Sequence, residues 1–192
     1  MHLETVVTIQ ELWLALAAVW VVTRFGSKRV KQRESPAGYL GRVVLLVVLF
    51  EFLFNDRLAT GWLGARFVPR SQNVADTGIA LTAIGIALAI WARLCLGGNW
   101  SGTVTLKEGH ELIRSGPYAR IRHPIYTGFA MAMAGTALAI GEWRAVLAFA
   151  GVTLAHYWKA RKEEAWLARE FGPAFEEHRA RTGMFLPRLV VR

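Results

Sequence analysis

Two stretches in the second half of the chain carry side chains that could bind or transform a ligand. The first combines His110-Glu-Leu-Ile-Arg-Ser-Gly-Pro-Tyr118 with Arg122-His-Pro-Ile-Tyr-Thr-Gly128. The second is Lys159-Ala-Arg-Lys-Glu-Glu-Ala-Trp-Leu167. Each brings ionisable groups and aromatic rings together over a short length of chain. This composition is typical of a binding site.

The first stretch predicts a helix that begins at Pro124, because proline is tolerated at the first helical position. The N–H groups at such an end suit a carboxylate or another anionic group. His123 would stand at the cap, and Tyr126 would add an aromatic face and a hydroxyl. An ordinary entry from a loop into a helix, with aromatic rings at the membrane interface, explains the same residues equally well.

The second stretch places opposite charges one helical turn apart. On a helix, Lys159 and Glu163 are four residues apart, and Arg161 and Glu164 are three apart. Surface ion pairing, worth about 0.2–0.5 kcal/mol per pair, is the interpretation that this pattern alone favours. The alternative is an acidic group that holds the hydroxyls or the cation of a cofactor, with a basic side chain beside it.

The elements that must position these residues are membrane-spanning helices. The chain has 192 residues, 54% of them hydrophobic, and its mean hydropathy is +0.30, yet its formal net charge is +9. The basic residues lie between apolar runs, whereas a nucleic-acid-binding domain would gather them in a stripe. We therefore expect an all-α integral membrane bundle that forms a single domain over 1–192. The expected spans are 6–25, 39–54, 77–96, 125–141 and 143–158, followed by a helical tail over 159–192.

The distribution of Lys and Arg predicts the orientation of the bundle. Of 23 such residues, segments 24–42, 93–122 and 159–192 hold six, five and eight, whereas 55–75 holds three and Arg144 adds one. Basic loops stay on the cytoplasmic side. We expect the N-terminus outside, the tail and the ligand-binding stretches in the cytoplasm, and the plasma or inner membrane as the location. No basic region precedes the first apolar run, so we expect a retained span there and no cleavable signal peptide.

A few residues inside the spans give further expectations. Glu51 either has a function or faces water at the end of its span. Cys95 is the single cysteine, and no Cys/His zinc spacing is present, so no metal site is expected. Four glycines predict close packing between helices, and two of them are expected at the hairpin formed by the last two spans. They are Gly78, Gly85, Gly128 and Gly135.

Taken in order, the motifs resemble the isoprenylcysteine carboxyl methyltransferase family and its bacterial relatives, which include phospholipid methyltransferases. The matching residues are His110-x-Leu-Ile-x-x-Gly-Pro-Tyr118, Arg122-His-Pro-x-Tyr-x-Gly128, Glu163-Glu164-x-x-Leu167, Phe171-Gly172 and Leu186-Pro187. They lie within 93–187. The combination is fairly specific, although each piece alone is weak.

The resemblance implies a helical membrane enzyme that uses S-adenosyl-L-methionine without a Rossmann domain and releases S-adenosyl-L-homocysteine. The chain has no GxGxxG motif, which agrees with this. The implied methyl acceptor is a lipidic small molecule or a lipidated substrate reached from the membrane lipids, and not a nucleic acid. The implied cofactor residues are His110, Glu111, Leu112, Ile113, Tyr118, His123, Pro124, Ile125, Tyr126 and Glu163.

The resemblance also implies a basic residue that faces the acceptor, one turn before the glutamates. Lys159 is the nearest match, where relatives can have an arginine, and Arg161 follows two residues on. Lys159, Arg161 and Glu164 are therefore the expected catalytic residues. A carboxylate acceptor such as an isoprenylcysteine needs no general base. An amine of a phospholipid must lose a proton, with Glu163, Glu164 or His123 as candidate bases. Phe175 and His178 stand where tyrosines are common in relatives.

Two other functions are compatible with a membrane bundle of this kind. A reductase of the sterol-reductase type shares a related Arg-x-Pro-x-Tyr-x-Gly element and uses NADPH. Those relatives often have Asn before the Tyr and Glu after the Gly, where this chain has Ile125 and Phe129. A non-enzymatic scaffold or a small transporter would leave the ordered polar motifs unexplained.

Overall fold

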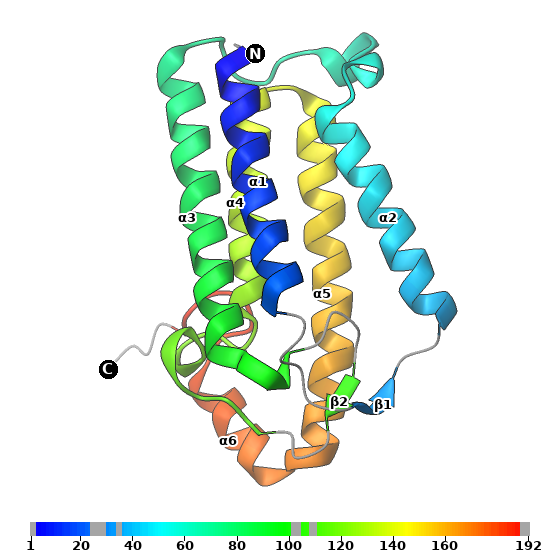
Figure 1. Cartoon of the computed structure of the whole chain (residues 1–192), viewed down its shortest axis with the longest axis vertical. Coiled ribbons are helices and arrows are strands. Elements are labelled where there is room, and N and C mark those ends of the chain that lie inside the picture. The colour runs from blue at the N-terminus through cyan, green and yellow to red at the C-terminus, as the bar shows by residue number, and fades with distance from the viewer. Residues whose placement is uncertain (1–2, 24–29, 34–35, 101–104, 108–110, 189–192) are drawn as a thin grey trace.

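The computed structural model describes residues 3–23, 30–33, 36–100, 105–107 and 111–188. Long helices run side by side along the longest axis, and the last helix crosses one end (Figure 1). The helices are α1 (Leu3–Thr23), α2 (Pro36–Phe54), α3 (Gln72–Leu96), α4 (Pro124–Ile140), α5 (Trp143–Phe171) and α6 (Pro173–Arg181). Short 3-10 turns are η2 (Asp56–Leu58), η3 (Gly61–Gly64), η4 (Gly97–Asn99) and η5 (Gly116–Ala119). The strands are β1 (Val30–Arg33) and β2 (Thr105–Lys107).

The five long helices confirm the predicted membrane bundle. Helices α1, α2 and α3 are long and apolar enough to cross a membrane, and α4 is a shorter apolar helix. Helix α5 has 29 residues and does not end where the apolar run ends. At about 1.5 Å per residue it is longer than the roughly 30 Å hydrocarbon layer. Its second half therefore carries Lys159, Glu163 and Glu164 beyond the apolar part of the bundle.

Local sequence signals set the helix ends. The Ser71 side chain accepts a hydrogen bond from the N–H of Val74 at the start of α3. Pro124 occupies the first turn of α4, as predicted. Gly141 ends α4 in the left-handed conformation, and Gly172 ends α5 with a φ of 49°. Glycine adopts these angles without the steric cost that a Cβ would add.

The closest helix packing joins α3 to α4 through the four predicted glycines. A Cβ on Gly85 would lie 2.4 Å from the backbone nitrogen of Ala132, and one on Gly135 would lie 2.4 Å from that of Thr82. The prediction of close packing is confirmed. The expected place of this packing is wrong, however: Gly128 and Gly135 pack against α3 and not against α5 of the hairpin.

Buried polar contacts hold the bundle at its middle and at the end where the α4–α5 hairpin turns. The indole nitrogen of Trp13 donates to the Thr136 hydroxyl over 3.1 Å, which joins α1 to α4. Arg144 is buried and donates to the carbonyl oxygens of Phe52, Leu53 and Asn55, which joins the start of α5 to the end of α2.

Two features at the ends of the bundle complete the fold. Glu51 is exposed and accepts a hydrogen bond from the Asn55 side chain, in line with the water-facing interpretation. Strands β1 and β2 pair antiparallel, which links the chain after α1 to the chain after α3. No pattern in the sequence predicts this small sheet, and the bundle itself is all-α as expected.

Candidate active site

A cavity of about 400 Å³ lies at the end of the bundle where α4 begins. We call its polar and charged lining residues the polar wall, and the apolar lining residues of its helices the apolar wall. The polar wall includes Asn99, Glu111, Arg122, His123, Lys159 and Glu163. The apolar wall includes Trp20, Val43, Leu46, Phe50, Phe129 and Val152.

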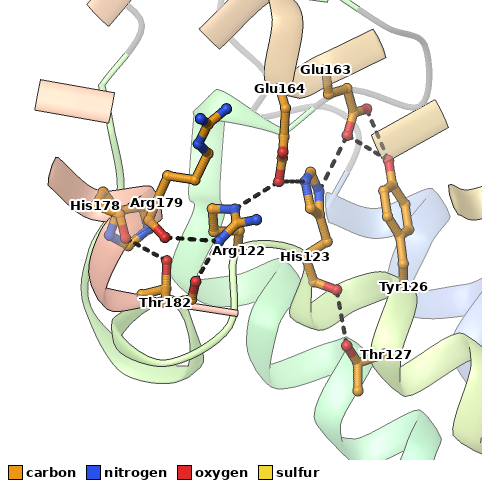
Figure 2. A network of polar contacts seen from close by, with 9 residues as sticks. All are labelled: Arg122, His123, Tyr126, Thr127, Glu163, Glu164, His178, Arg179 and Thr182. Atoms are coloured by element: carbon orange, nitrogen blue, oxygen red, sulfur yellow. Dashed lines mark hydrogen bonds and ion pairs between the residues drawn. The ribbon is translucent and has the colours of Figure 1, made fainter. Parts of the chain in front are cut away.

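Arg122, His123 and Glu164 form a polar cluster at the cavity, in which His123 and Glu164 are buried and Arg122 is half-buried (Figure 2). The Arg122 Nε donates to a Glu164 oxygen over 2.7 Å, and the His123 Nε2 lies 3.3 Å from the same oxygen. Burial alone would raise the pKa of Glu164, but the hydrogen bonds from His123 and Arg122 outweigh this effect and lower it to about 2. Glu164 therefore stays charged and holds the start of α4 against α5.

Glu163 takes a different set of partners and lines the cavity. The Tyr126 hydroxyl donates to its two carboxylate oxygens, with distances of 2.8 and 2.9 Å (Figure 2). The Lys159 Nζ lies 3.8 Å from one of these oxygens, and the His123 Nδ1 lies 3.7 Å from the other. Successive residues on a helix point in different directions. Glu163 can therefore line the cavity while Glu164 bonds to Arg122 and His123.

Three aromatic rings form a stack along the cavity wall. The His123 and Tyr126 ring centroids lie 5.5 Å apart with planes 7° apart, and the Tyr126 and His156 centroids lie 4.8 Å apart at 15°. The Lys159 Nζ sits 5.3 Å from the centre of the Tyr126 ring. Such a surface suits a flat heterocycle or a cation.

The chain after α6 fixes His123 and Arg122 in place. The N–H of Arg122 donates to the carbonyl oxygen of Gly183, and the N–H of His123 donates to that of Met184. The Thr127 hydroxyl donates to the carbonyl oxygen of Phe185 over 2.7 Å. The N–H of His123, at the cap of α4, is therefore bonded within the protein.

The Tyr118 and His178 side chains also line the cavity with altered acidity. Burial raises the pKa of the Tyr118 hydroxyl well above its ordinary value, with smaller effects from neighbouring charges. Burial lowers the pKa of His178, and the nearby Arg114 and Arg122 lower it further. Both groups are therefore neutral at pH 7.

Known proteins resemble this chain over the region that carries the site. Residues 78–169 match the model of the "Isoprenylcysteine carboxyl methyltransferase (ICMT) family". The eukaryotic intramembrane Ras methyltransferase ICMT has a similar fold, with a TM-score of 0.50, 24% identity, and coverage of 82% of this chain and 54% of that one.

Two curated relatives extend the comparison. The cobalt-zinc-cadmium resistance protein CzcN of Cupriavidus metallidurans is 32% identical over 77% of this chain and 62% of its own length. The protein-S-isoprenylcysteine O-methyltransferase of Schizosaccharomyces pombe is 30% identical over 58% of this chain and 48% of its own length. The chain thus spans less than two thirds of the length of each relative.

Within the described residues, no group of three or more His, Cys, Asp or Glu side chains could hold a metal ion.

Most of the residues that the family motifs predicted for the site meet at the cavity. Its lining includes Glu111, Leu112, Ile113, Tyr118, His123, Ile125, Tyr126, Lys159 and Glu163. Pro124 is buried in the first turn of α4 and is not part of the lining. His110 lies outside the described residues.

The two basic residues predicted to face the acceptor are separated by the fold. Lys159 lines the cavity, whereas Arg161 is exposed and does not line it. The expected pairing of Arg161 with Glu164 is wrong, because Glu164 turns inward to Arg122 and His123. The pairing of Lys159 with Glu163 is confirmed at 3.8 Å.

Several lining residues were not predicted from the motifs. His156 has a detectable signal, because it lies three residues before Lys159 and seven before Glu163, on the same face of a helix. Trp20 and Phe50 come from distant helices, and nothing in their local sequence indicates the site. The unpredicted lining residues also include Asn99, Trp100, Arg122, Trp166, Phe175 and His178.

Proposed function

We propose that this chain is a membrane methyltransferase that uses S-adenosyl-L-methionine and methylates a lipidic acceptor. The observation that carries the proposal is the convergence of the family motifs on one cavity that joins a polar wall to an apolar wall. A donor that is polar and cationic and an acceptor that is apolar need such a divided site.

The polar wall has the chemistry to hold the donor. Carboxylates at Glu111 and Glu163 suit the hydroxyls and the positive charges of the donor, and Tyr126 and Trp100 offer ring faces. When bound, the cofactor supplies an activated methyl group. The work of the protein is then to hold the two reactants close and in line, which can lower the barrier by several kcal/mol, on the order of 7–11 at best.

The apolar wall offers an entry for a lipid tail. Val43 and Leu46 of α2 line the cavity, while Leu40, Val44 and Val47 of the same helix are exposed apolar residues. An exposed apolar face on a membrane helix contacts lipid tails. The acceptor would move from the bilayer past α2 into the cavity, and the donor would arrive from the aqueous end.

The orientation follows from the charges. Figure 1 places α6, the sheet and the ends of α1, α3 and α5 at one end of the bundle. The Lys- and Arg-rich segments are those that adjoin these elements in the sequence. By the positive-inside rule, this end and its cavity face the cytoplasm, and the N-terminus faces the opposite side.

Methyl transfer to lipid tests the proposal directly. Membranes that contain the chain are incubated with radiolabelled S-adenosyl-L-methionine, and the lipid extract is separated by chromatography. We expect a labelled lipid, and much less of it with Glu163→Gln at a low concentration of the methyl donor, since this change removes the carboxylate from the polar wall. Label only in water-soluble products, or none with protein that remains folded, would contradict the proposal.

A further inference from the structure

His156 lies where the two walls of the cavity meet. Its ring packs on Tyr126 of the polar wall with a centroid distance of 4.8 Å and on Phe129 of the apolar wall with a centroid distance of 5.4 Å. The cavity is also lined by residues of α5 on either side of His156 in the sequence, which are Val152, Ala155, Lys159 and Glu163. A donor on the polar wall and a lipid on the apolar wall would react beside this imidazole.

The charged side chains of the cavity do not favour an anionic acceptor. Its charged lining among the described residues consists of Glu111, Arg122, Lys159 and Glu163, so the two signs balance. Both basic groups already have carboxylate partners. Arg122 pairs with Glu164 at 2.7 Å, and Lys159 pairs with Glu163 at 3.8 Å. A lipid carboxylate would have to compete for a cation that a glutamate holds.

An imidazole at this point suits an acceptor that must lose a proton. A neutral imidazole has a ring nitrogen that can accept a proton, which is why histidine often serves as a general base. The His156 ring contacts Tyr126 and the uncharged Phe129, both of α4. Lys159 and Glu163 line the cavity further along the same face of α5. The lining residues of α2 add Tyr39 as their one titratable side chain.

We propose that His156 is the base that removes a proton from the ammonium headgroup of a lipid amine, which is the methyl acceptor of this site. This inference rests on the proposed methyltransferase function. The imidazole nitrogen takes one proton from the ammonium and passes it to water. The freed nitrogen lone pair then bonds to the methyl carbon as the carbon–sulfur bond breaks, and that electron pair stays on sulfur. The product amine carries the positive charge.

Two lipids with the same tails and different headgroups test acceptor contact without turnover. Protein with labelled histidines is saturated with S-adenosyl-L-homocysteine in detergent and followed by NMR, and His156→Gln assigns the resonance. Phosphatidylethanolamine, which has N–H groups, is expected to shift the His156 signal. Phosphatidylcholine, which has none, is expected to leave it nearly unchanged. Equal shifts, or no shift with either lipid, would overturn the proposal.

Turnover gives the second test. His156→Gln is expected to lower the methylation rate of phosphatidylethanolamine by about 100-fold or more at pH 7. The rate of this variant should recover at higher pH, where the headgroup loses its proton without a base. Its affinity for S-adenosyl-L-homocysteine should equal that of the parent. Tyr157→Phe is the control on the same helix, because Tyr157 does not line the cavity.

The outcomes separate the two proposals. An unchanged rate in His156→Gln, or methylation by the parent protein of a prenylated cysteine carboxylate instead of the amine, would overturn the role of His156 while leaving a methyltransferase. A parent protein that does not bind S-adenosyl-L-homocysteine would overturn the proposed function and this inference with it.

Discussion

At the scale of single residues, the adjacent Glu163 and Glu164 make different contacts. Glu163 lines the cavity with Tyr126 and Lys159, while Glu164 is buried against Arg122 and His123. The sequence could indicate that one of the two contacts a ligand, but not that the other is structural, because the choice depends on the rotation of α5 against α4. The same rotation turns Arg161 away from the cavity and brings His156 to it.

The low pKa of Glu164 predicts a pH-dependent stability. A carboxyl with a pKa of about 2 in the folded protein, against an ordinary value of 4.5, stabilises the fold above about pH 4.5. This contribution is lost as the pH falls toward 2. Glu164→Gln is expected to lower stability at pH 7 by about 1–3 kcal/mol, because two hydrogen bonds to a charged group weaken.

Thermal melting in detergent between pH 7 and pH 3 measures this effect. The difference in Tm between the parent and Glu164→Gln should shrink as the pH falls. Glu177→Gln removes two exposed ion pairs, with Arg114 and Arg181, and should change Tm little at pH 7. A difference between parent and Glu164→Gln that stays constant down to pH 3 would contradict the role assigned to this carboxylate.

At the scale of elements, hydropathy predicts the membrane helices closely. Spans expected at 77–96 and 125–141 appear as Gln72–Leu96 and Pro124–Ile140. The span expected at 143–158 is the apolar half of a helix that continues to Phe171. Hydropathy detects only the part in lipid. The strand pairing of 30–33 with 105–107 is not predictable in this way, because its partners are distant in the chain and have no shared pattern.

Close approach of α3 and α4 should make their glycines sensitive to substitution. Gly85→Ala is expected to lower the free energy of unfolding by about 1–3 kcal/mol, because its Cβ would meet the backbone of Ala132 at 2.4 Å. Gly41→Ala is the control, since a Cβ there meets no atom within 4 Å. Thermal melting of both variants in the same detergent checks this. Equal Tm values would show that the helices are not so tightly packed.

At the scale of the whole molecule, the fold separates the aqueous and lipid sides of one cavity. Composition and charge suffice to predict the bundle and its expected orientation. The apolar wall could not be predicted, because Trp20, Phe50 and Val152 meet only when α1, α2 and α5 are assembled. Taken separately, the sequences around these residues are typical of any apolar membrane helix.

The expected orientation can be measured with fusions to the C-terminus. In a bacterial host, green fluorescent protein fused there is expected to fluoresce and alkaline phosphatase to be inactive, because the basic tail stays in the cytoplasm. Fusions after residue 60, in the connection between α2 and α3, should behave in the opposite way. Active phosphatase at the C-terminus would place the cavity on the wrong side for a cytoplasmic methyl donor.

Calorimetric titration of the detergent-purified protein with S-adenosyl-L-homocysteine, and separately with NADPH, tests the central claim most directly. We expect S-adenosyl-L-homocysteine alone to bind, about 10–100-fold more weakly in Glu163→Gln, because that change removes a charged hydrogen-bond acceptor from the polar wall. Glu170→Gln, on the exposed end of α5, should bind as the parent does. Binding of NADPH alone would indicate a reductase and contradict the account, and binding of neither ligand would contradict it as well.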